Sequence, residues 1–161
     1  MLLDNNRLAA RWGLDHRTDE ARDRALDVLC HRYVRELQHV MRLRQHAERI
    51  ADGAIGPALL RIAAREAAHL RTIAENIENL GGKLPAVIDF HCSHDNAWEY
   101  LRSDLDEERR CIAEIEEDKL RIAGEFPVIA GLLERIETDA KKHREEIRAL
   151  LSDERRPLWA A

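Results

Sequence analysis

Apolar residues recur along the chain in alternating steps of three and four, which places their side chains on one face of an α-helix. Glycine and proline interrupt this pattern at three places, namely residues 52–57, 81–85 and 124–127. We expect a helix in each of the four segments that remain, which are 18–51, 57–80, 94–123 and 127–151. The pattern therefore predicts an all-α protein whose four apolar stripes face one another in a four-helix bundle.

The lengths of the connections predict the path of the chain. The first and third connections are short, which favours antiparallel hairpins, whereas residues 81–93 are numerous enough to cross the length of a bundle. In this interpretation residues 1–161 are one domain. Residues 1–17 are an N-terminal arm, 18–151 the bundle and 152–161 a C-terminal tail.

Composition and charge narrow the possible partners. The formal net charge is −5 and acidic residues alternate with basic ones, so we expect no nucleic-acid partner. No apolar run approaches the roughly 18–20 residues of a membrane span, and the N-terminus lacks the pattern of a signal peptide. The widely spaced Cys30, Cys92 and Cys111 form no C-x-x-C pair, which favours a reducing compartment. We therefore expect a cytoplasmic protein that neither enters nor crosses a membrane.

Polar residues interrupt the predicted apolar stripes near the middle of each helix. The interrupting residues are Glu36, Glu66, His69, Glu108 and His143. Buried carboxylates without partners are very costly, so these must either keep their protons or have cations beside them. Lys119 is the only basic residue on the stripes and lies three turns from Glu108, too far to neutralise the group. A metal cluster in the core is the more economical interpretation.

The spacing of these residues supports a site for two ions. Glu66 and His69 form an E-x-x-H motif, and residues three apart share a helix face. Glu36 precedes His69 by 33 residues, and Glu108 precedes His143 by 35, so each hairpin offers a Glu and then a His. Carboxylates with some imidazole suit Fe(II), Mn(II) or Zn(II).

At these residues the sequence resembles the ferritin-like di-iron carboxylate proteins, and bacterioferritin most closely, over residues 26–151. The resemblance rests on Glu36-Leu37 with His46-Ala47 ten residues on, on Glu66-Ala67-Ala68-His69, and on Leu101-Arg102-Ser103-Asp104-Leu105 leading to Glu108. It implies a ferritin-like antiparallel bundle with a long crossover between helices two and three. It also implies a di-iron site, with zinc or manganese as alternatives, that binds Fe(II) and oxidises it with dioxygen or peroxide for iron storage or detoxification. The implied metal ligands are Glu36, Glu66, His69, Glu108 and His143.

The sequence departs from this family in its last helix. A second E-x-x-H is expected there, but Ala140 stands three residues before His143. Asp139 is a substitute candidate ligand, although its side chain is shorter and starts about 100° around the helix. Ala67 stands where bacterioferritin has a haem-ligating Met, so no haem is predicted. The tail is short and contains Pro157, so a fifth helix lining a cage pore is not expected.

Two other functions stay open at this point. A catalytically reduced relative would hold one structural ion through Glu36, Glu66 and His69. A metal-free helical interaction module would hold none and would keep its carboxyls protonated.

The partners expected are metal ions and further copies of the chain, as a homodimer or a higher homo-oligomer. The apolar stripes are broader than one helix face, which suggests a second buried surface, and the residues that broaden them are Leu37, Leu60, Leu70, Ile77 and Leu132. His39 and His46 are expected on a helix surface or at a subunit contact.

Overall fold

The computed structural model describes residues 19–86, 93–122 and 124–152. Within them the chain forms four helices, which are α2 (Asp19–Arg49), α3 (Ile55–Asn79), α4 (Ala97–Ile122) and α5 (Pro127–Leu151). Their bounds agree with the predicted segments to within a few residues, and no strand occurs among the described residues. The predicted arm and tail lie outside these ranges, apart from Ser152, and stay predictions.

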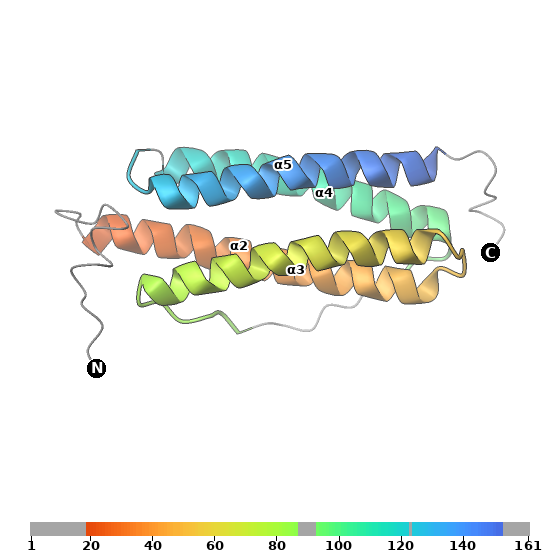
Figure 1. Ribbon diagram of the computed structural model, residues 1–161, viewed down its shortest axis with the longest axis horizontal. Helices are drawn as coiled ribbons and strands as arrows, with labels where there is room; N and C mark the ends of the chain where they lie inside the picture. The colour runs from red at the N-terminus through yellow and green to blue at the C-terminus, as the bar shows by residue number, and fades with distance from the viewer. Residues whose placement is uncertain (1–18, 87–92, 123, 153–161) are drawn as a thin grey trace.

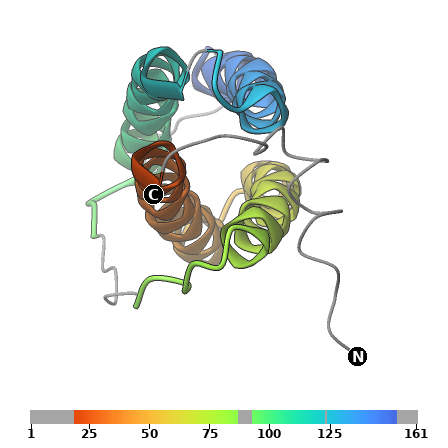
Figure 2. The ribbon, with the colours of Figure 1, turned by 90° about the vertical axis from the view of Figure 1, so that its left-hand side faces the viewer.

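The helices form two antiparallel hairpins that pack side by side (Figure 1). One hairpin is α2 with α3, and the other is α4 with α5. The end of α3 and the start of α4 lie at opposite ends of the bundle, so the connection between them spans its length, as predicted. Viewed from one end, the four helices surround a common axis (Figure 2). The structure therefore confirms the predicted four-helix bundle with a long crossover.

Turn residues end and begin the helices. Gly81 follows α3 with a φ of 77°, and Gly124 follows α4 with a φ of 80°, a conformation that residues with a Cβ rarely adopt. Pro127 stands at the start of α5, where its missing N–H removes no helical hydrogen bond. Before α4, the Asn96 side chain accepts a hydrogen bond from the backbone N–H of Glu99 at 3.0 Å.

A layer of buried polar side chains divides the apolar core into two clusters. One cluster includes Leu29, Ile73, Ile115, Phe126, Leu133 and Ile136. The other includes Leu43, Leu59, Ile62, Leu101 and Ile147. On every helix this layer falls between the two clusters along the chain, near the middle of the bundle, and its members are Glu36, His39, Glu66, Glu108 and His143. Each cluster excludes water from one side of it.

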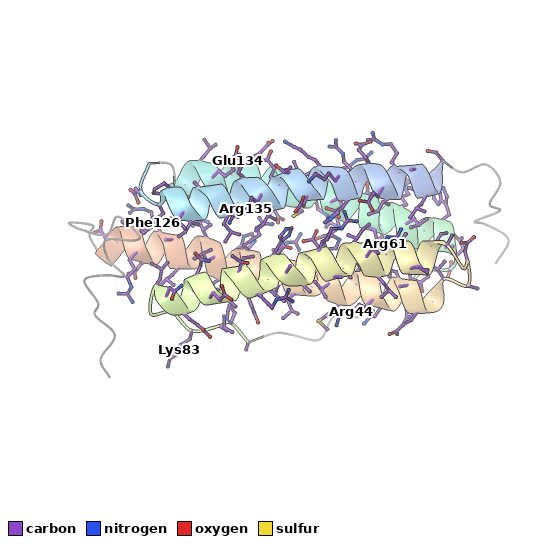
Figure 3. The ribbon with its side chains drawn as sticks, in the orientation of Figure 1. Arg44, Arg61, Lys83, Phe126, Glu134 and Arg135 are labelled. Atoms are coloured by element: carbon purple, nitrogen blue, oxygen red, sulfur yellow. The ribbon has the colours of Figure 1, made fainter. Side chains whose placement is uncertain are left out.

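The outer surface of the bundle is mostly charged, and side chains such as Arg44, Arg61 and Glu134 are exposed on it (Figure 3). Two of the residues expected on a second buried surface, Ile77 and Leu132, instead belong to the core, with exposed fractions of 0% and 2%. That part of the expectation was wrong because each helix packs against two neighbours, which widens its apolar face. No described helix has the length and apolar character needed to cross a membrane.

Candidate metal centre

The five residues implied as ligands converge from all four helices onto the polar layer. Glu36 comes from α2, Glu66 and His69 from α3, Glu108 from α4 and His143 from α5. All are buried except His69, whose side chain keeps 13% of its exposure. The position of each follows from helical periodicity, because each lies on the same face as apolar core residues one turn away.

Glu66 lies at the centre of this arrangement. Its Oε1 lies 2.7 Å from Nδ1 of His143, and its Oε2 lies 3.1 Å from Nδ1 of His69. His143 Nδ1 also lies 3.5 Å from Oε1 of Glu108. The donor atoms form two sets, and within each set all atoms lie within 4.8 Å of one another. One set comes from Glu36, Glu66 and His69, and the other from His39, Glu66 and Glu108. Because Glu66 belongs to both sets, the two sets form one centre.

Several donor atoms in this layer are buried without a hydrogen-bond partner. They are Oε2 of Glu36, Nε2 of His39, both carboxylate oxygens of Glu108 and Nε2 of His143. Buried polar atoms are nearly always paired, so a group of unpaired oxygens and imidazole nitrogens needs an explanation. Carboxylate oxygens and neutral imidazoles are the donors that divalent first-row metals take, so these residues fit such ions.

Burial makes the two outer carboxyls hard to ionise. Burial and the negative charge of Glu66 hold the pKa of Glu36 well above its usual range. Burial also raises the pKa of Glu108, although the nearby His39 opposes this shift. Without cations, these two side chains therefore favour their neutral, protonated form.

The pKa shifts of Glu66 and its two histidines favour their charged forms instead. Burial raises the pKa of Glu66, but hydrogen bonds with Glu36, His143 and His69 outweigh it and hold that pKa well below its usual range. Burial lowers the pKa of His143, but its contacts with Glu108 and Glu66 outweigh burial and raise the pKa to about 9. Protons on the histidines can thus balance the charge of Glu66, and metal ions would have to displace them.

Asp139 contacts the site at its edge. Its Oδ2 lies 3.1 Å from Nε2 of His69, and its Oδ1 accepts a hydrogen bond from Lys142 at 2.7 Å. Asp139 belongs to neither set of converging donor atoms. The pKa of His69 is lowered by burial but raised more strongly by Glu66 and Asp139, so the net shift is upward. This geometry is that of a carboxylate that orients a histidine.

The sequence expectation for His39 and His46 was wrong, because both are buried, with exposed fractions of 3% and 0%. They belong to a row of basic residues on α2 at intervals of seven, Arg32, His39 and His46, which faces an acidic row on α4, Asp118, Glu108 and Asp104. Seven residues are nearly two helical turns, so the row stays on one face of α2. That interval, read against the acidic positions of the third segment, is the signal that could have identified the row.

Arg32 is the largest of the fully buried side chains, and its guanidinium lies one turn from Glu36. It donates a hydrogen bond to Oδ2 of Asp118 at 2.9 Å and approaches Sγ of Cys111 at 3.5 Å. The thiol lies 3.9 Å from Oε1 of Glu36, and burial holds its pKa well above the usual range. The positive charge of Arg32 therefore lies closer to Glu36 than Lys119, the only basic residue on the predicted stripes, lies to Glu108.

Solved structures share this fold. A ferritin-like diiron-carboxylate protein from Bacillus anthracis matches with a TM-score of 0.75 and 20% identity, over 82% of this chain and 98% of that one. A bacterioferritin from Desulfovibrio desulfuricans, with a diiron site, matches with a TM-score of 0.75 and 22% identity, over 83% and 81%. A dodecameric thioferritin, the bacterioferritin-related protein of Bacteroides fragilis, matches with a TM-score of 0.74 and 16% identity, over 82% and 86%.

No protein-family model and no curated protein matches the sequence. The structural matches define the class of this chain as a protein with the ferritin-like four-helix fold, which the motifs predicted. What the centre does is a separate question, because likeness at this level of identity establishes the fold alone.

Proposed function

We propose that the chain binds a pair of divalent metal ions, Fe(II) above all, between its four helices and promotes the oxidation of Fe(II) for iron storage or detoxification. The observation that carries the proposal is the group of unpaired donor atoms on Glu36, Glu108 and His143, buried between two apolar clusters. Diiron proteins among the structural matches make iron the first candidate, with zinc or manganese as alternatives.

Each residue has a defined task in this proposal. Glu66 contributes to both metal positions, because it belongs to both sets of converging donors. Glu36 and His69 complete one position with it, and Glu108 and His143 supply the other. Asp139 accepts the Nε2 proton of His69, which leaves Nδ1 as the donor to the metal.

Iron is the substrate in this proposal. Two bound Fe(II) ions give one electron each and become Fe(III), and the two electrons with two protons reduce dioxygen to hydrogen peroxide, or hydrogen peroxide to two water molecules. The protein supplies the carboxylates that stabilise the added positive charge, and the apolar clusters keep bulk water from the centre. Metal binding releases the protons held by Glu36, Glu108 and the histidines, because only their deprotonated forms bind metal.

Anaerobic titration with Fe(II), followed by exposure to air, tests the proposal. We expect uptake of two ions per chain, then growth of the ultraviolet absorbance of Fe(III) bound to oxygen ligands. Absence of both uptake and oxidation would contradict the proposed function.

A second candidate function is a reduced relative with one structural ion or none. It is favoured by Ala140, which is buried with an exposed fraction of 1% where a ligand carboxylate is expected. Replacing it, Ala140→Glu, separates the two functions. A large gain of iron oxidation in that variant would favour the reduced relative, whereas native-like oxidation before and after the change would favour the first function.

We also propose that the chain forms a homodimer or a higher homo-oligomer in the cytoplasm, without haem. Exposed apolar side chains support self-association, among them Leu60 and Leu120, with exposed fractions of 49% and 79%. The dodecameric protein from Bacteroides fragilis has a similar fold. Sedimentation velocity of the metal-free and metal-loaded protein tests this, and a monomer at all concentrations would contradict it.

A further inference from the structure

His39 is the one member of the α2 row that does not form a close pair with its acidic neighbour on α4. Arg32 bonds Asp118 at 2.9 Å, and Nδ1 of His46 lies 2.9 Å from Oδ2 of Asp104. In contrast, Nε2 of His39 lies 3.8 Å from Oε1 of Glu108, which exceeds the length of a hydrogen bond. The outer two members of the row are therefore explained as structural pairs, and the middle one is not.

The unpaired nitrogen of His39 lies in the metal centre. The side chain is 3% exposed, and its Nε2 has no hydrogen-bond partner. One of its ring nitrogens lies within 4.8 Å of donor oxygens of both Glu66 and Glu108. A buried imidazole nitrogen that lies beside two carboxylates but beyond hydrogen-bond distance is placed as a metal ligand would be.

The last helix lacks a donor that centres of this class have. Centres of this class take a Glu from each of two helices and an E-x-x-H from each of the other two. In α5 the position three residues before His143 is Ala140, which has no donor atom and packs in the apolar core. On α2, Glu36 and His39 form an E-x-x-H that the class does not require there.

We propose that His39 is a metal ligand and supplies, from α2, the donor that α5 lacks. This inference rests on the proposed function, because it needs a centre that binds two ions. The resulting set has an E-x-x-H on α2 and another on α3, with Glu108 from α4 and His143 from α5. The set keeps six donor residues, but it exchanges one carboxylate for one imidazole.

That exchange changes which ions the centre prefers. Three carboxylates carry one negative charge fewer than the four of the class, so two divalent ions leave the centre with a net positive charge. Imidazole favours Fe(II), Co(II) and Zn(II) relative to Mn(II), which prefers oxygen donors. His39 is therefore a specificity-determining residue as well as a ligand.

Equilibrium dialysis against Co(II) under anaerobic conditions tests the assignment without any turnover. We expect the full chain to bind two ions and His39→Ala to bind one, or to bind the second more than about 100-fold more weakly, since loss of an outer partner alone costs about 10–100-fold. The matched control is His31→Ala, which removes an exposed histidine from the same helix. We expect it to bind two ions with unchanged affinity.

A rescue variant separates ligation from a structural role. Adding Ala140→Glu to the His39→Ala protein should restore the second Co(II) ion, and it should shift the preference from Zn(II) towards Mn(II). If His39→Ala does not fold, as judged by its circular dichroism spectrum, His39→Gln keeps the size and polarity of the side chain, and the same loss is expected from it.

The outcomes distinguish the two proposals. Two ions in the His39 variant, with affinity like that of the native chain, would overturn the role of His39 and leave the proposed function intact. No Co(II) bound by the native chain would overturn the proposed function itself. Loss of the second ion without rescue by Ala140→Glu, and without the shift towards Mn(II), would contradict the exchange of ligands between α2 and α5.

Discussion

The Nδ1 atom of His143 on α5 lies 2.7 Å from Oε1 of Glu66 on α3, and this contact joins the two hairpins at the middle of the bundle. Glu66 also contacts His69 one turn further along its own helix. One carboxylate thus links both candidate metal positions to both hairpins. Its replacement is the most sensitive single test of the centre.

We predict that Glu66→Gln abolishes binding at both metal positions. An amide has no negative charge and cannot share two ions, so Fe(II) affinity should fall by more than about 100-fold, and iron oxidation should fall to the rate in buffer. Isothermal titration under anaerobic conditions measures the affinity. Glu75→Gln, on the exposed side of α3, is the matched control and should behave like the native chain.

Removal of metal should lower the melting temperature. A ligand that binds only the folded state stabilises it by about 2.7 kcal/mol at one hundred times its dissociation constant. For a chain of this length each kcal/mol shifts melting by about 2–4 °C, so a chelator should lower it by about 5–10 °C. Scanning calorimetry with and without chelator measures the shift. An unchanged melting temperature would instead support the metal-free interaction module.

Asp139→Asn should weaken metal binding without changing the number of ions bound. Asp139 contacts Nε2 of His69 and lies outside both sets of converging donors, so its loss affects the orientation of a ligand. Partners of this kind contribute about 10–100-fold to affinity. Dialysis against Co(II) measures both quantities. Loss of a whole ion would show that Asp139 is itself a ligand.

Acid should weaken the bundle partly through Glu137. Hydrogen bonds from Lys119 and Lys141 lower the pKa of Glu137 below its usual value. A folded-state pKa below the unfolded one gives stability that is complete above the unfolded value, near pH 4.3, and is lost as pH falls through the folded value. The stability difference between the native chain and Glu137→Gln should therefore be largest at neutral pH and shrink in acid.

Urea denaturation at several pH values measures this dependence. The comparison needs the metal-free protein, so that ligand protonation at the centre is the same in both chains. Glu117→Gln, an exposed glutamate of α4, is the matched control. A constant difference between native chain and Glu137→Gln across the acid range would contradict the role of the two lysines.

The fold was predictable because the residues that end and begin its helices act locally. Gly81, Gly124 and Pro127 end or begin helices through their own backbone preferences, which do not depend on distant contacts. The convergence of Glu36, Glu66 and Glu108 was predictable for a related reason. A carboxylate within an apolar stripe must face the same core as its neighbours, and the four stripes meet in one place.

The rest of the centre depends on contacts between helices that no single stripe reveals. A single apolar stripe defines one face of a helix, but α2 packs against both α3 and α4 (Figure 2). On the side of α2 that faces α4, the residues at intervals of seven are all basic, namely Arg32, His39 and His46. In a sequence, such residues are typical of a solvent-exposed helix face. Only the pairing of α2 with an acidic row on α4 makes their burial favourable, and that pairing is a tertiary property.

Of the six proposed donor residues, four come from the α2–α3 hairpin and two from the α4–α5 hairpin, and none of the six lies on the connection between the hairpins. A chain severed between α3 and α4 would thus yield two fragments, each with an incomplete set of ligands. Reassociation of such fragments should depend on divalent ions, because metal ligation would hold together the two hairpins that the intact chain joins covalently. On the proposed function, association of the two fragments would therefore report the binding of metal.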